Sequence, residues 1–235
     1  GNAGPSELAT NLEILISYFQ AIKNAILINQ ISLVIVGPEI PLINGITDFI
    51  EKDSELTNVL VVGPSSHGAK LEGSKEYSKE FMERHKIPTA PYKSFNQDKL
   101  KEGMDYLNSM TPPYVLKADG PAAGKGVLII NDLKEAQLEL ENMLVNNKFG
   151  NSGQNVVIEG FLDGIEISCF VLTDGKSYIT LPNAKDYKRI GEGDTGLNTG
   201  GMGAISPVSF ANEEFLSKVE NKIIKPTIRG IAKEQ

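Results

Sequence analysis

One stretch of this sequence decides the fold: Lys117-Ala118-Asp119-Gly120-Pro121-Ala122-Ala123-Gly124-Lys125-Gly126-Val127. A lysine ends one apolar run, Tyr114–Lys117, a loop of small residues follows, and a second apolar run, Val127–Ile130, begins. Small residues let backbone N–H groups approach phosphate oxygens, and lysines add positive charge. The stretch therefore predicts two antiparallel strands with a phosphate-binding loop between them.

This loop departs from the Walker A pattern, which is Gly-x-x-x-x-Gly-Lys-Ser/Thr before a helix. The spacing of the glycines before Lys125 is one residue shorter, Gly126 replaces the hydroxyl residue, and a strand follows. Taken alone, the loop also fits a flexible hairpin with no ligand.

A second segment, residues 157–168, predicts a site for adenosine. An apolar strand runs into the pair Phe161-Leu162, turns at Asp163-Gly164 and returns with Glu166. Adenine needs an apolar slot at a strand end, and a carboxylate accepts hydrogen bonds from the two ribose hydroxyls. Phe161 and Leu162 suit the adenine and Glu166 suits the ribose. Without the neighbouring loop, a solvated hairpin is the safer interpretation.

A third segment, residues 183–207, is rich in glycine and polar residues and is too long for an ordinary loop. Gly191-x-Gly193-x-x-Gly196 matches the dinucleotide fingerprint, but we expect no strand directly before it and no helix after it. We therefore interpret the segment as an anion- and substrate-binding loop. Lys188 and Arg189 would supply its charge, and Gly200-Gly201 would allow close approach of the backbone.

The first third of the chain alternates short apolar runs with helical patterns. Strands are predicted at Ile31–Val36 and Val59–Val62, with a helix at Asn44–Lys52 between them. Such a βαβ unit indicates a parallel sheet, whose ligands sit at the carboxyl ends of the strands. Gly37-Pro38-Glu39 and Gly63-Pro64-Ser65 then lie on a ligand-binding edge, or they are merely turns.

The remaining elements follow from apolar periodicity and capping residues. Further strands are predicted at 13–16, 156–158, 166–172 and 177–181. Helices are predicted at Ser17 onward with Gln20 as capping partner, at 74–85, 96–110 and 132–144, and from Asn212 with a kink at Pro226.

Composition excludes several classes of protein. The 235 residues carry 23 Lys and Arg against 30 Asp and Glu, a net charge of −7, which disfavours general binding to nucleic acid or to anionic membranes. The single cysteine, Cys169, excludes a disulfide framework and fits a reducing compartment; we interpret it as a core residue. Two histidines, His67 and His85, are too few for a histidine-rich metal site, and we interpret both as structural or surface residues.

Taken together, the motifs resemble the phosphoribosylamine–glycine ligases (glycinamide ribonucleotide synthetases) of the ATP-grasp superfamily. The resemblance spans essentially the whole chain and rests on residues 1–4, 36–39, 71–75, 117–127, 159–168 and, most specifically, 193–204. It implies an α/β protein in which a partial parallel-sheet N-terminal (pre-ATP-grasp) domain, residues 1–72, precedes an incomplete ATP-grasp module, residues 73–235.

The resemblance also implies a role for each matching residue. ATP is expected to contact Lys75, Lys117, Gly120, Ala123, Gly124, Lys125, Gly126, Glu159, Phe161, Leu162 and Glu166. Substrate is expected to contact Glu39, Asp194, Asn198, Thr199, Gly200, Gly201, Met202 and Gly203. In the family's chemistry Lys188 and Arg189 become the catalytic charges.

The family joins glycine to 5-phosphoribosylamine with ATP, through glycyl phosphate, in purine biosynthesis. It uses Mg²⁺ or Mn²⁺, whose ligands we expect beyond Gln235, so we assign no metal ligand here and expect an inactive fragment. The implied enzyme is cytoplasmic, binds small molecules and is a monomer or a dimer. Two alternatives stay open: another ATP-grasp ligase or carboxylase of the purine pathway, and a nucleotide-binding fragment without turnover.

Overall fold

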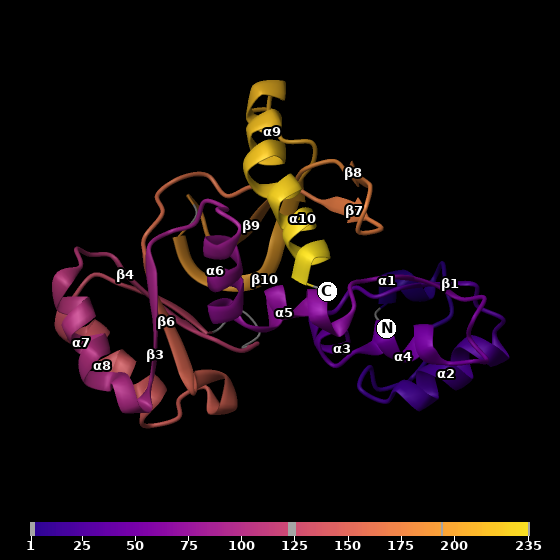
Figure 1. The fold of residues 1–235 in the computed structure, drawn as a ribbon, viewed down its shortest axis with the longest axis horizontal. Helices are drawn as coiled ribbons and strands as arrows, with labels where there is room; N and C mark the ends of the chain where they lie inside the picture. The colour runs from indigo at the N-terminus through magenta and orange to yellow at the C-terminus, as the bar shows by residue number, and fades with distance from the viewer. Residues whose placement is uncertain (1–2, 122–125, 194, 235) are drawn as a thin grey trace. The chain divides into compact units, whose positions relative to one another are not determined.

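The computed structural model describes residues 3–121, 126–193 and 195–234 (Figure 1). It divides into two compact units, Gly1–Gly73 and Ser74–Gln235. Within the described residues, no helix is long and apolar enough to cross a membrane.

The first unit contains a small parallel sheet and short helices. β1 (Leu33–Ile35) pairs with β2 (Leu60–Val62) in parallel, from Leu33 opposite Leu60 to Ile35 opposite Val62. The helices are α1 (Ala3–Ser6), α2 (Phe19–Ile28), α3 (Glu39–Ile43), α4 (Ile46–Lys52) and α5 (Ser66–Gly73). The predicted parallel βαβ unit is therefore confirmed, and the carboxyl ends of β1 and β2 lie at the same edge.

The core of this unit lies between α2, α4 and the sheet. Ile26 of α2 is buried with Ile46 and Ile50 of α4 and with Leu56. Phe19 and Ile22 pack against the same cluster, so the apolar side chains of α2 share one helical face.

Several local predictions in this unit are wrong. Residues 13–16 form no strand, because within the described chain they have no neighbouring strand to satisfy their backbone groups. Ser17 does not cap α2; the N-cap position is Tyr18, which makes no side-chain capping bond. The continuous apolar run at β1 indicates a strand that is buried on both faces. In the structure Leu33 and Ile35 are exposed, so one face of β1 is not buried. The short helices α3 and α5 were not predicted.

The second unit is built on an antiparallel sheet with strand order β3-β6-β4-β5. Its strands are β3 (Tyr92–Asn96), β4 (Tyr114–Ala118), β5 (Val127–Ile130) and β6 (Asn155–Gly160). β4 and β5 pair from Tyr114 opposite Ile130 to Lys117 opposite Val127. The prediction that the glycine-rich loop joins two adjacent antiparallel strands is confirmed.

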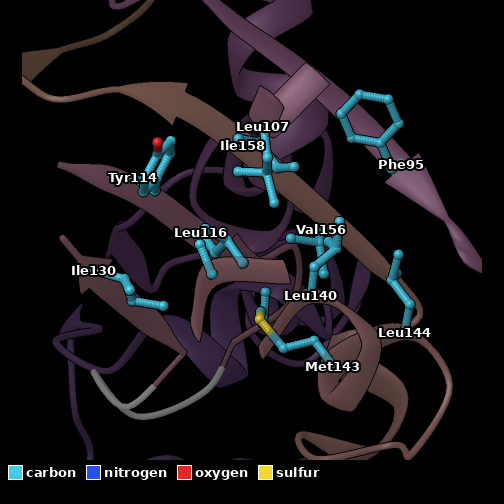
Figure 2. Close-up of a cluster of buried hydrophobic side chains, with 12 residues drawn as sticks. Phe95, Leu107, Tyr114, Leu116, Ile130, Leu140, Met143, Leu144, Val156 and Ile158 are labelled. Atoms are coloured by element: carbon cyan, nitrogen blue, oxygen red, sulfur yellow. The ribbon is translucent and has the colours of Figure 1, made fainter. Parts of the chain in front are cut away.

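Helices α7 (Leu100–Ser109) and α8 (Leu133–Leu144) pack on this sheet and bury its main core. Figure 2 shows the side chains that meet there, among them Leu116 of β4, Val156 and Ile158 of β6, and Leu140 of α8. Because side chains alternate along a strand, Glu159 of β6 points away from this core. It faces α6 (Lys75–Arg84) instead.

Most helix starts in this unit follow their predicted caps. Ser74 Oγ accepts from the Tyr77 N–H at 3.0 Å, and Asp132 Oδ1 accepts from the Glu135 N–H at 2.9 Å. His85 is the C-cap of α6, as expected for a histidine at a helix end. The predicted helix 96–110 begins as a 3₁₀ turn, η1 (Gln97–Lys99), before α7.

A 3₁₀ turn, η2 (Gly150–Gly153), precedes β6, and two hairpins follow it. β7 (Val171–Thr173) and β8 (Tyr178–Thr180) pair as an antiparallel hairpin. Strands were predicted at 166–172 and 177–181, and the first of them is confined to β7. β9 (Lys185–Gly191) pairs with β10 (Thr195–Ile205), so residues 183–207 are not the predicted long loop. A strand does lead into Gly191, contrary to our expectation, and no helix follows it.

The chain then enters one helical run. α9 (Glu213–Val219) is capped by Asn212, which accepts from the Phe215 N–H at 2.9 Å. A π-helical segment, η3 (Glu220–Ile224), leads into α10 (Lys225–Glu234). Pro226 lies in the first turn of α10 and cannot donate a backbone hydrogen bond, so the predicted irregularity takes the form of this π segment.

The end of α10 is tied to the end of α6 by Glu234. Its carboxylate accepts from Arg84 Nε at 3.0 Å and from an Arg84 terminal nitrogen at 2.9 Å, and it lies 2.7 Å from His85 Nε2. The hydrogen bonds from Arg84 and His85 lower the pKa of Glu234 from 4.5 to about 2.

A carboxylate with a lowered pKa stabilises the fold above its unfolded-state pKa and loses that contribution as the pH falls through its folded-state value. We therefore expect Glu234→Gln to lower the thermal midpoint at pH 7, with the difference from the unsubstituted protein shrinking between about pH 4.5 and pH 2. Thermal unfolding across that pH range measures it, with Glu214→Gln on α9 as the control. A difference that stays constant with pH would contradict this assignment.

Candidate functional site

The base of the glycine-rich loop is hydrogen-bonded to the start of α6. The Asp119 carboxylate accepts from Ser74 Oγ at 3.0 and 3.1 Å and from the Glu76 N–H at 2.7 Å. Lys75 Nζ donates to the carbonyl oxygens of Asp119 and Gly120, both at 3.3 Å. The structure thus brings Lys75 to the start of the loop, and its contact with ATP phosphates stays a prediction.

Gly120 is held where no side chain fits. A Cβ atom there would lie 2.9 Å from Ser152 Oγ and 3.1 Å from Ser152 Cα, and the Gly120 N–H donates to the Ser152 carbonyl at 3.3 Å. At the other end of the glycine-rich loop, the Gly126 carbonyl accepts a hydrogen bond from the Ala118 N–H at 2.8 Å. Among the described residues, this bond is the last one between the two chain segments that continue as β4 and β5. The predicted contacts Ala123, Gly124 and Lys125 lie outside the described residues.

Lys117 lies at the end of β4 and shares one carboxylate with a second lysine. Lys117 Nζ pairs with Glu159 Oε1, and Lys79 Nζ pairs with Glu159 Oε2. The Glu159 side chain is 6% exposed, that of Lys79 10% and that of Lys117 30%. Lys79 also donates to Thr89 Oγ1 at 2.7 Å, so Lys117 is the member of the trio with the most access to solvent.

The charge of Glu159 depends on these two lysines. Burial raises its pKa, but the hydrogen bonds from Lys117 and Lys79 outweigh burial, and the net effect is a lowered pKa. Glu159 is therefore a carboxylate at neutral pH, and its oxygens are used within the protein. We predicted Glu159 as an ATP contact; the structure places its side chain as a partner of Lys117.

A cavity of ≈ 400 Å³ opens beside β5 and the segment that follows β6. Its lining includes Val127, Ile129, Phe161, Leu162, Gly164, Ile165, Glu166, Lys185, Asp186, Lys188 and Arg189. This size is within the range of small-ligand pockets. Lys117 pairs directly across the ladder from Val127, which lines the cavity.

The cavity brings together residues that we predicted for adenosine and for charge. Phe161 and Leu162 are exposed, Leu162 by 72%, as a slot for a planar apolar ring requires. Glu166 Oε1 is ion-paired with Lys188 Nζ. The strand expected to return through Glu166 is not observed: residues 161–167 have no regular secondary structure.

The predicted substrate-binding residues lie along β10, not in a loop. Asn198 pairs with Arg189 and Gly203 with Tyr187 across the β9–β10 ladder. Thr199 Oγ1 donates to the Lys188 carbonyl at 2.8 Å, which ties β10 to the cavity wall. Gly200 and Met202 are exposed, and Gly201 has a φ of +128°, a value that favours glycine. Asp194 lies outside the described residues.

Glu39 belongs to the other unit. It is the first residue of α3, directly after Pro38, at the edge where β1 and β2 end. This is the edge predicted for ligands, and the substrate contact of Glu39 stays a prediction.

No group of three or more His, Cys, Asp or Glu side chains is arranged to hold a metal ion among the described residues. The place of the metal ligands stays a prediction.

Cys169 is half-buried, belongs to neither buried hydrophobic cluster and is not part of a strand. The predictions of a core residue and of a strand over 166–172 are therefore wrong at this position. Burial raises the pKa of its thiol, and a raised pKa disfavours a reactive thiolate.

Sequence reasoning missed Lys79 and the role of Asp119. Lys79 follows Lys75 by four residues on the predicted helix, so both side chains lie on one helical face. That spacing is the signal that could have associated Lys79 with the phosphate site. Asp119 lies within the stretch that predicts the phosphate-binding loop, but its bonds to Ser74 and Glu76 could not be read from the sequence.

Comparisons with known proteins agree with this geometry. Residues 73–235 match the family described as phosphoribosylglycinamide synthetase, ATP-grasp (A) domain, and residues 1–72 match its N domain. The phosphoribosylamine–glycine ligase of Haemophilus influenzae is 43% identical over 236 residues, which cover 100% of this chain and 54% of that protein. This chain thus spans about half the length of that relative.

Comparison with solved structures indicates the same family. The phosphoribosylamine–glycine ligase of Thermotoga maritima has a TM-score of 0.79 at 34% identity, covering 100% of this chain and 54% of that one. A biotin carboxylase of Campylobacter jejuni has a TM-score of 0.69 at 16% identity, over 92% of this chain and 46% of that chain, and shares the fold alone. The predicted fold class, parallel α/β followed by ATP-grasp, is confirmed. The chain belongs to the phosphoribosylglycinamide synthetase family.

Proposed function

We propose that this chain is part of an ATP-dependent ligase that joins glycine to 5-phosphoribosylamine, giving glycinamide ribonucleotide, ADP and phosphate. The observation that carries the proposal is the cavity beside β5, where Phe161, Leu162, Glu166 and Lys188 meet. The names of the Haemophilus and Thermotoga relatives supply the reaction. We also propose that residues 1–72 belong to a substrate domain and residues 73–235 to an ATP-grasp module, as the two matched ranges support.

In this reaction a carboxylate oxygen of glycine attacks the γ-phosphorus of ATP and ADP leaves. The amine nitrogen of phosphoribosylamine then attacks the acyl carbon of glycyl phosphate, and phosphate leaves. Positioning and neutralisation of charge dominate such chemistry, so the protein needs cations and backbone donors more than a nucleophile.

The residues divide this work by position. Adenine would lie against Phe161 and Leu162, with the ribose on Glu166. Lys75 and Lys117 would contact the phosphates under the glycine-rich loop. Lys188 and Arg189, which line the cavity, would neutralise charge at the transferred phosphoryl group, and β10 from Asn198 to Gly203 would contact substrate.

A divalent metal, Mg²⁺ or Mn²⁺, is proposed for the whole enzyme, where it would offset charge on the phosphates. The proposed ligase acts in the cytoplasm on small molecules. A second ATP-grasp ligase activity of the purine pathway is disfavoured by the match of both N and A domains to one family.

Glu166→Ala tests the adenosine site. We expect about tenfold weaker binding of both adenosine and ATP, because the ribose loses a charged acceptor, while glycine binding is nearly unchanged. Adenosine is the decisive ligand, since the substitution also frees Lys188 from its ion pair and an uncharged ligand is insensitive to that change.

Isothermal titration calorimetry measures these affinities, and Asp163→Ala, an exposed carboxylate outside the cavity lining, is the matched control. Unchanged adenosine affinity in Glu166→Ala would count decisively against the assignment.

We expect that the 235 residues of this chain are not sufficient for catalytic turnover. We expect the 235-residue chain to bind ATP weakly and to release no ADP in response to glycine and phosphoribosylamine, whereas a full-length relative does. A side-by-side assay of ADP release checks this. Comparable rates would place the whole catalytic site within these residues.

A further inference from the structure

Lys79 is a buried lysine that the proposed reaction does not use. It lies on α6, its side chain is 10% exposed, and its ammonium group has two fixed partners, Glu159 Oε2 and Thr89 Oγ1. A buried ammonium group is costly unless it is paired and hydrogen-bonded. Lys79 therefore has little freedom to leave Glu159.

Lys117 pairs with the other oxygen of the same carboxylate. Two ammonium groups and one carboxylate sum to a charge of +1, and the more exposed ammonium group is that of Lys117. Without Lys79, the remaining pair of Lys117 and Glu159 would be neutral. The net positive charge that this trio can offer to a phosphate therefore depends on Lys79, although Lys117 is the residue proposed to contact the phosphate.

We propose that Lys79 is a positioning residue that keeps Glu159 neutralised, so that the Lys117 ammonium group can turn toward the phosphates of ATP. This inference rests on the proposed function of Lys117. If Lys79 were removed, Lys117 could reach a phosphate only by leaving a buried carboxylate unpaired, which is strongly unfavourable.

Calorimetric titration with ATP and with adenosine tests the proposal. We expect Lys79→Met to weaken ATP binding about tenfold, the effect of losing one charge-assisted contact, and to leave adenosine binding unchanged. Lys79→Arg keeps the charge and should bind ATP nearly as the unsubstituted protein does. Lys148→Met, which breaks the ion pair with Glu139 on α8, is the control and should change neither affinity.

A double variant separates charge balance from packing. Lys79→Met combined with Glu159→Gln leaves Lys117 as the one charge of the trio and restores +1, so ATP affinity should return to within about threefold of the unsubstituted protein. A packing role would not be rescued this way, because glutamine leaves the Lys79 space unchanged. A double variant as weak as Lys79→Met, or a parallel loss of adenosine binding, would overturn the proposal.

Lys117→Met distinguishes this inference from the proposed function. If Lys117→Met leaves ATP affinity unchanged, the assignment of Lys117 to the phosphates is wrong. If it weakens ATP binding while Lys79→Met does not, the inference about Lys79 alone is wrong. Should Lys79→Met fail to fold, the double variant still tests the proposal, because an ATP affinity more than about threefold below that of the unsubstituted protein would overturn it.

Discussion

Glu159→Ala is expected to destabilise the Ser74–Gln235 unit by about 3–5 kcal/mol, the cost of breaking a buried ion pair from one side. The carboxylate is 6% exposed and is shared by Lys79 and Lys117. Its removal leaves the Lys79 ammonium group buried with Thr89 as its remaining hydrogen-bond partner. The loss is therefore much larger than the small net value usual for an ion pair at the surface.

Native-state hydrogen exchange at the amides of β4 and β6 measures this cost, because Glu159 lies on β6 and pairs across to Val115 of β4. The matched control is Glu139→Ala, which breaks the more exposed pair with Lys148 and should cost less than about 1 kcal/mol. Equal costs for the two variants would show that the Glu159 trio is not a buried electrostatic unit.

Asp119→Ala should cost about 3 kcal/mol, because two charge-assisted hydrogen bonds are lost in a half-buried position. The donors, Ser74 Oγ and the Glu76 N–H, both lie at the start of α6, so the substitution removes the side-chain contacts between the start of the glycine-rich loop and the helix that carries Lys75. The hydrogen bonds from Lys75 to the Asp119 carbonyl remain. Nucleotide binding should weaken together with stability.

Asp132→Ala is the natural comparison, because Asp132 caps α8 with one hydrogen bond, to the Glu135 N–H, from an exposed position. We expect about 1 kcal/mol there, the usual value of an N-cap. Asp119→Asn should recover about half of the Asp119→Ala loss, since its amide oxygen still accepts from Glu76. Urea unfolding followed by circular dichroism gives all three values. A cost for Asp119→Ala no greater than that for Asp132→Ala would contradict the role of Asp119 as the anchor of the loop.

Local chemistry made part of the fold predictable. The runs at 114–117 and 127–130 are apolar, are bounded by proline or glycine and become β4 and β5. Ser74 and Asp132 mark the starts of α6 and α8 because a side-chain oxygen there satisfies a free helix N–H.

The β9–β10 hairpin was not predictable by the same means. Residues 185–205 lack apolar alternation and contain many glycines, which are depleted in strands. Their strands form by pairing with each other in a hairpin, from Lys185 opposite Ile205 to Gly191 opposite Thr195, and not by packing of an alternating apolar face. The run at 13–16 shows the converse: these residues form no strand, and no strand pairs with them among the described residues.

The candidate site was predictable as a set of residues and not as an arrangement. Resemblance to a family indicated Phe161, Leu162, Glu166 and Lys188, which the cavity brings together. Nothing in the sequence showed that Glu166 pairs with Lys188. Lys79 escaped notice because a lysine on a helix usually reaches solvent, and its burial depends on how α6 packs against the Glu159 face of the sheet.

A crystal structure of the protein with a non-hydrolysable ATP analogue tests the proposed site directly. We expect adenine in the ≈ 400 Å³ cavity against Phe161 and Leu162, and ribose hydroxyls within hydrogen-bond distance of the Glu166 carboxylate. We also expect the phosphates at the Lys75 and Lys117 ammonium groups. A nucleotide bound with its base away from Phe161 and Leu162, or with its phosphates remote from both lysines, would contradict the proposed site.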